Sequence, residues 1–174
     1  MGPAISDYPQ INELCSYIRS QDMPMSVASF RADSVTQELV DALAQSGQRT
    51  LTLAPEAGSE KIRHIINKGI EEEHLFKSIS MGINAGVKNY RLYIMVGLPN
   101  EDENDIKAIV DMTICLKQYM EKLGSKGTLT LSINPFIAKP CTPFQWSAMA
   151  DLKQTEKYFK KYVHRVFHFS RGVG

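Results

Sequence analysis

The sequence predicts an α/β fold built on parallel strands, and two observations support this prediction. Four short runs rich in apolar and β-branched residues have the length and composition of strands, at 25–30, 50–55, 90–96 and 128–134. Helical patterns separate these runs, whose starts lie 25, 40 and 38 residues apart, so each pair of strands has room for a helical crossover. Since four parallel strands cannot close a barrel, we expect either an open α/β domain or part of a larger barrel.

The elements are expected to alternate along the chain. Strands with nearly continuous apolar runs are typical of sheets that are buried on both faces, and we expect this here. Ser34 and Asn100 have the spacing of helix N-caps, since each is followed three residues later by a glutamine or a glutamate. The predicted helices cover 11–20, 34–47, 61–67, 71–86 and 100–124, with a last one from 151 onward.

Size and composition indicate one globular domain. The chain has 174 residues, of which 43% are hydrophobic and 22% charged, and this excludes a disordered protein. No linker divides it, so we take 1–174 as a single domain whose C-terminal helix lies within 147–174. The net charge of +1 does not favour a dedicated nucleic-acid binder.

The sequence indicates a cytoplasmic protein without a metal site of its own. It has no apolar run long enough to cross a membrane and no signal peptide. The three cysteines, Cys15, Cys115 and Cys141, form no CxxC pair, and such sparse thiols suit a reducing compartment. The four histidines lie on predicted helices without a partner at ligand spacing, so we expect no metal-binding residue.

The carboxyl ends of the predicted strands are where a ligand would bind, because parallel α/β folds gather their ligands there. Glu56 follows the second strand and could accept hydrogen bonds from a sugar diol, or could simply complement a helix N-terminus. Gly97, Leu98 and Pro99 follow the third strand. A glycine there lets a flat ligand approach the backbone, whose N–H and C=O groups could read a base edge, although a plain strand-to-helix turn has the same sequence.

Three further residues at these strand ends have two possible roles each, one in ligand binding and one in structure. Arg31 could bind an anionic group or could pair only with Asp33. Lys68 could act likewise or could complete the C-terminus of a short helix. Phe136 lies in a segment with three prolines that cannot continue a sheet, and it could stack on a ligand or pack on the next helix.

The last predicted helix has a basic face. Lys157, Lys160, Lys161 and Arg165 lie on it. Such a face is typical of a solvated helix, and the alternative is a non-catalytic binding module that contacts RNA.

Taken in order, the strand ends resemble those of the radical SAM superfamily. The likeness is to the branch of the tRNA methylthiotransferases, the elongator catalytic subunit and cobalamin-associated methylases. It rests on Ser29–Asp33, on Leu51–Gly69 with its APEAGSE and INKG sequences, on the GLPNE turn at 97–101, and on the PFIAKPCTPF sequence at 135–144. The resemblance spans Asp7 to Trp146 and implies an α/β partial parallel (βα) barrel, with four units that correspond to strands three to six of a radical SAM barrel.

The resemblance also implies roles for individual residues. Glu56 falls where relatives bind the ribose of S-adenosylmethionine (SAM), and Lys68, twelve positions later, where they bind its methionyl carboxylate. The segment Gly97–Pro99 falls where backbone lines the adenine, and Phe136 falls beside it. Arg31 is a further candidate contact to the carboxylate or to a substrate.

One departure from the family is large. The CxxxCxxC loop that holds the [4Fe–4S] cluster is absent, as are the first two strands. The resemblance therefore implies part of an iron–sulfur enzyme, a radical SAM oxidoreductase or a methyl- or methylthiotransferase. The intact enzyme would cleave SAM reductively to a 5′-deoxyadenosyl radical, and this part would be inactive alone. The resemblance leaves room for cobalamin and does not identify a substrate.

Overall fold

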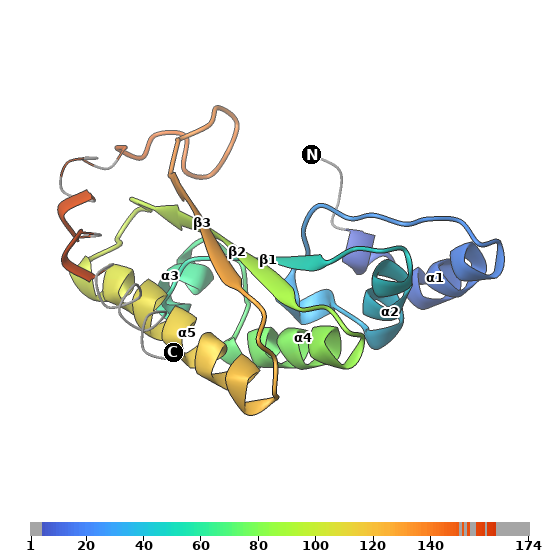
Figure 1. The fold of residues 1–174 in the computed structure, drawn as a ribbon. Coiled ribbons are helices and arrows are strands. Elements are labelled where there is room, and N and C mark those ends of the chain that lie inside the picture. Colours follow the sequence, from blue (N-terminus) through green and yellow to red (C-terminus); the bar gives the residue numbers. More distant parts are fainter. Residues whose placement is uncertain (1–4, 150, 152, 154–155, 159, 163–174) are drawn as a thin grey trace.

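The computed structural model describes residues 5–149, 151, 153, 156–158 and 160–162, and a parallel sheet forms its centre (Figure 1). The sheet has three strands in the order β1 (Thr50–Glu56), β2 (Asn89–Val96) and β3 (Leu129–Pro135). Both strand pairs are parallel, with Leu92 of β2 aligned between Leu53 and Leu131. The parallel α/β fold expected from the sequence is confirmed.

Helices connect the strands and gather on one side of the sheet, where Figure 1 shows α4 and α5 side by side. Short 3-10 turns also occur at Ile5–Asp7 and Ala32–Ser34. The helices are α1 (Ile11–Ser20), α2 (Gln37–Gln45), α3 (Glu60–Ile65), α4 (Glu72–Asn84) and α5 (Glu103–Lys122).

The first predicted strand differs in the structure. Met25–Phe30 makes only an isolated parallel bridge, between Phe30 and Leu53, at the free edge of β1. The N–H groups of Met25 and Val27 donate to the side chains of Ser46 and Gln48, whereas the Phe30 N–H donates to the Thr52 carbonyl of β1. The described part of the chain therefore has three strands where the sequence predicted four.

Two predicted helix starts are also displaced. The N-cap of α2 is Thr36, whose hydroxyl accepts from the Leu39 N–H, and not Ser34, which lies in a 3-10 turn. The N-cap of α5 is Asp102, which forms a capping box with Asp105. Each observed N-cap lies two residues after the predicted one, because a better-placed acceptor lies there.

The sheet is covered on one face only. In β2, the buried side chains Tyr90, Leu92, Ile94 and Val96 alternate with the exposed or half-buried Arg91, Tyr93 and Met95. Nearly every side chain of β1 is buried, whereas those of β3 are half-buried or exposed. The expectation of strands buried on both faces holds for β1 alone, because the open face of this partial barrel is not covered by the helices.

One main core fills the space between the sheet and the helices α2, α4 and α5. Residues 156–158 and 160–162 are helical, and Tyr158 and Tyr162 pack against this core. The rest of the predicted C-terminal helix, including residues 163–174, lies outside the described residues. Among the described helices, none has both the length and the apolar character needed to cross a bilayer.

Candidate functional site

The carboxyl ends of all three strands meet in a second, small apolar cluster. Ala57 follows β1, Leu98 follows β2 and Ile62 lies on α3, and each is at most 4% exposed. The partly buried Phe136, which follows β3, packs against the same group together with Ile66 and Met95. We call these six residues the exit cluster. It brings together the strand ends that the sequence analysis singled out.

Glu56 leaves β1 in an unusual backbone conformation. The register between β1 and β2 shifts between Leu53 and Glu56, and Glu56 itself has φ of 69°. This left-handed conformation is unfavourable for a residue with a Cβ, and it ends the strand by turning the chain out of the sheet. The Glu56 side chain is 23% exposed, so its carboxylate remains accessible at this edge.

The chain returns to Glu56 after α3. Asn67 and Gly69 both have positive φ, at 54° and 62°, and together they turn Lys68 back toward the strand end. The Lys68 Nζ lies 3.1 Å from the Glu56 Oε1, and its side chain is 18% exposed. The residue predicted to bind the ribose of SAM and the residue predicted to bind its methionyl carboxylate are therefore neighbours.

Arg31 joins this pair through its guanidinium. It forms an ion pair with Asp33 at 2.7 Å, as one of the two sequence interpretations expected, and this pairing raises its pKa. The same Nη2 donates to the Lys68 carbonyl oxygen at 2.9 Å. Arg31 therefore supports the backbone of Lys68, and its own charge is already paired.

The Gly97–Pro99 turn is held by a carboxylate that follows it. The Gly97 N–H donates to the Glu101 Oε2 in a short hydrogen bond, and the Glu101 N–H donates to the Leu98 carbonyl at 3.0 Å. Burial raises the pKa of Glu101 to about 7, although its hydrogen bonds from backbone N–H groups act in the opposite sense. The Gly97 N–H is thus already taken by Glu101 and is not free for a base edge.

Phe136 lies where β3 ends. Its N–H continues the ladder by donating to the Val96 carbonyl at 2.8 Å. Its ring meets that of Phe144 edge to face, with 6.1 Å between centroids. Phe136 therefore both packs inward on the exit cluster and presents an aromatic edge near the open end.

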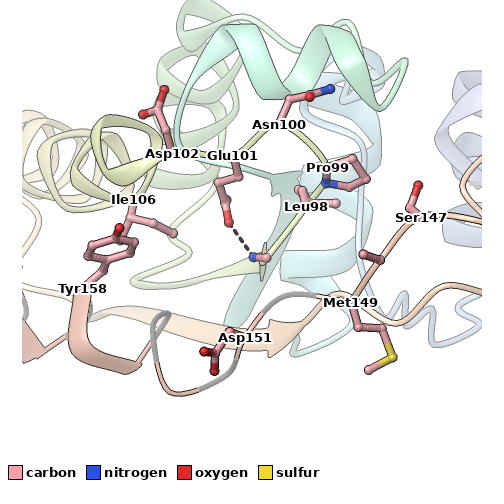
Figure 2. A pocket seen from close by; sticks show the side chains of 12 residues that line it. Leu98, Pro99, Asn100, Glu101, Asp102, Ile106, Ser147, Met149, Asp151 and Tyr158 are labelled. Carbon is pink, nitrogen blue, oxygen red and sulfur yellow. Dashed lines mark hydrogen bonds between the residues drawn. The ribbon is translucent and has the colours of Figure 1, made fainter.

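A cavity of about 510 Å³ opens beside the Gly97–Pro99 turn (Figure 2). Its walls are residues 97–102, Ile106 and the described residues 147–149, 151 and 158. It includes none of Arg31, Glu56, Lys68 or Phe136. Of the predicted site residues, Gly97–Pro99 line this cavity, whereas the Glu56–Lys68 pair lies outside it.

The described residues do not form a metal centre. They include no group of three His, Cys, Asp or Glu side chains placed to hold an ion. Cys15 is buried on α1, whereas Cys115 on α5 and Cys141 beyond β3 are exposed, and all three are free. Grouped thiolates, which hold [4Fe–4S] clusters in proteins, are therefore not found among the described residues.

Sequence reasoning assigned no role to two residues of this region. Arg63 on α3 is completely buried and donates to three backbone carbonyls around the Glu56–Lys68 segment. Glu101 holds the Gly97 turn. Glu101 could have been suspected from its place four residues after Gly97, whereas Arg63 lies on a predicted helix face with no distinguishing pattern.

Comparisons with known proteins agree with this arrangement. The profile of the Radical SAM superfamily matches residues 2–113. An uncharacterized protein of Methanocaldococcus jannaschii is 35% identical over 171 residues, which cover 95% of this chain and 36% of that protein. This chain therefore belongs to the radical SAM superfamily, and it spans about a third of the length of that relative.

A solved structure shows the same fold. Coproporphyrinogen III oxidase (HemN) from Escherichia coli, described as a radical SAM enzyme, matches 91% of this chain and 36% of its own, with a TM-score of 0.59. The sequence identity is 14%, so this likeness concerns the fold alone. The fold is thus that of part of a radical SAM barrel.

Proposed function

We propose that this chain is the SAM-binding part of a radical SAM enzyme. In this proposal Glu56 binds the ribose hydroxyls and Lys68 the methionyl carboxylate. The Gly97–Pro99 backbone and Phe136 flank the adenine. The observation that carries the proposal is the 3.1 Å contact between Glu56 and Lys68 beside the exit cluster, in a chain of this superfamily.

The Glu56–Lys68 ion pair can be opened by a ligand. Both side chains keep some contact with solvent, at 18% exposed for Lys68 and 23% for Glu56, so a ligand can reach the pair. A ribose diol would then donate to the Glu56 carboxylate, and a ligand carboxylate would take its place beside the Lys68 ammonium. Bound SAM supplies the reductive cleavage chemistry of the superfamily.

A second part of the proposal concerns the iron–sulfur cluster of the intact enzyme. We propose that another segment carries the cluster-binding cysteines, and that this chain alone does not cleave SAM. The proposed setting is the reducing cytoplasm, consistent with free cysteines. The likeness to the methylthiotransferase, elongator and methylase branch rests on the motifs alone, and no described residue indicates cobalamin.

The RNA-binding alternative rests on the basic face of the last helix. Two of its lysines form exposed ion pairs, Lys160 with Glu156 and Lys161 with Glu103, both at 2.6 Å, which an RNA phosphate could displace. We favour a small-molecule cofactor over nucleic acid as the partner of this chain, because the strand-end motifs and the superfamily match point to SAM.

The test is the affinity for SAM, measured by equilibrium dialysis on the full gene product. Lys68→Met and Glu56→Gln should each weaken binding about 10- to 100-fold, since each loses a hydrogen bond to a charged group. Lys68→Arg should retain most of the affinity. The matched control is Lys117→Met, which breaks a partly exposed ion pair with Glu121 at the other end of α5. Unchanged affinity in both site variants would overturn the proposal.

A further inference from the structure

Arg63 is the largest completely buried side chain of the described chain, and it is a cation. Buried guanidinium groups are costly unless their donors are satisfied, so its surroundings need an explanation. No carboxylate among the described residues pairs closely with it, because the Glu60 Oε1 lies 3.8 Å away on a side chain that is 55% exposed. Burial accordingly lowers the pKa of Arg63.

The Arg63 donors reach both ends of one segment. Its Nε donates to the Ile70 carbonyl at 2.5 Å, while its Nη1 donates to the carbonyls of Ala57 at 3.1 Å and Gly58 at 2.9 Å. Ala57 and Gly58 directly follow Glu56, and Ile70 comes two residues after Lys68. The guanidinium thus ties together the two chain ends that carry the Glu56–Lys68 pair.

The Arg63 backbone completes this clamp. Its carbonyl accepts the Lys68 N–H at 2.8 Å, and the Lys68 carbonyl accepts from Arg31 at 2.9 Å. On the other side, Gly58 lies so close to α5 that an added Cβ would sit 2.2 Å from the Ile109 nitrogen. The loop after Glu56 is therefore fixed between α5 and the Arg63 guanidinium.

We infer that Arg63 is a positioning residue for SAM binding, and that it acts by holding Glu56 and Lys68 at the spacing the ligand requires. Arg63 does not contact the ligand, because it is wholly buried beneath the segment. The inference rests on the proposed function, since it concerns the same pair. It explains why a charged side chain is retained in an apolar site, where a hydrophobic residue would avoid the cost of burial.

The test is a double-mutant cycle on SAM affinity in the full gene product. Arg63→Met should weaken SAM binding about tenfold in the native background, and by less than about twofold in the Lys68→Met background. This coupling is expected because Arg63 acts through the pair. A general loss of folded protein would instead lower the apparent affinity equally in both backgrounds.

Two further variants keep the test decisive. Arg63→Lys retains the charge but can satisfy fewer of the three carbonyls, so its affinity should lie between those of the native protein and Arg63→Met. It also replaces Arg63→Met in the cycle if that variant does not fold. Met120→Ala, which opens the core near the other end of α5, should lose stability while keeping SAM affinity.

The outcomes separate the two claims. If Lys68→Met weakens binding while the Arg63 variants do not, or if the two effects are simply additive, the positioning role of Arg63 is wrong and the proposed function stands. If neither Lys68→Met nor Glu56→Gln changes the affinity, the proposed function itself fails.

Discussion

At the scale of single residues, charged groups at the strand ends are held by backbone contacts as much as by one another. Arg31, Arg63 and Glu101 each bond to main-chain groups of the segments that they support. Charge-assisted bonds of this kind are roughly twice as strong as neutral ones. The local geometry of the site is therefore set by a few ionised side chains, and one of them should respond to pH.

Glu101 makes folding stability depend on pH. Its pKa is raised from 4.5 to about 7 in the folded protein, mainly by burial. Between about pH 4.5 and 7 the folded protein retains a proton that the unfolded chain has released, so stability should fall as the pH rises through this window. At about 1.4 kcal/mol per pKa unit, the Glu101 contribution is on the order of 3 kcal/mol.

Chemical denaturation at about pH 5 and about pH 7.5 checks this prediction. Glu101→Gln should flatten the loss of stability between the two values. Glu73→Gln, at an exposed position on α4, controls for the change in net charge. An unchanged slope in Glu101→Gln would show that another group causes the dependence.

The residue scale is also where sequence reasoning was least complete. The family motif assigned Glu56 and Lys68 to two groups of the same ligand, and the ion pair between them is seen only in the structure. The burial of Arg63 depends on contacts with Ile70 and Gly58, which a helical pattern cannot reveal. The positive φ of Glu56 likewise arises from the bulge after β1, and no local signal in the sequence marks it.

At the scale of elements, the segment from β1 to α4 is locked by its packing on α5. The Ser59 hydroxyl caps α3 and donates to the Asp105 Oδ1 at 2.6 Å, so the starts of α3 and α5 are joined. Gly58 lies directly against the α5 backbone. The glycine is needed there because no side chain fits between the segment and the helix.

Gly58→Ala should destabilise the chain by about 3 kcal/mol, because the new methyl group would press on backbone atoms that cannot rotate away. Gly47→Ala is the comparison. Gly47 has open space around it, so the Gly47→Ala variant is strained only by the φ of 83°. It should lose about 1 kcal/mol of stability. Thermal and urea unfolding of both variants give the values. Equal losses would mean that the segment moves away from α5 without cost.

Three of the four predicted strands are confirmed within about two residues, because long apolar runs between helical patterns are a strong signal. The run at 25–30 was predicted as a strand for the same reason. It is reduced to a bridge because side chains of Ser46 and Gln48 occupy its hydrogen-bonding groups. Local pattern shows which segments can extend, and only tertiary contacts decide which of them pair.

At the scale of the whole molecule, the open face of the sheet follows from a partial fold. The chain forms part of a radical SAM barrel, and it matches 36% of the length of each of the two relatives. In β2, Arg91 and Tyr93 alternate with the buried Tyr90 and Leu92, and they lie on the face that a complete barrel would enclose.

The proposal that another segment carries the cluster-binding cysteines predicts the outcome of cluster reconstitution. The chain alone, supplied anaerobically with iron and sulfide, should show no [4Fe–4S] absorbance, because its three cysteines lie apart on α1, α5 and the segment after β3. The full gene product should show it. Ultraviolet–visible spectra with iron and sulfide analysis decide the matter. A cluster on the isolated chain, or none on the full product, would contradict this account.

The left-handed backbone at Glu56 has a consequence for how this protein can change over time. Such a conformation stores on the order of 1 kcal/mol in a residue that bears a side chain, and glycine would release it. Backbone strain alone would therefore favour glycine at this position, whereas the proposed role in SAM binding requires the glutamate. Stability and the proposed function thus make opposite demands on this one residue.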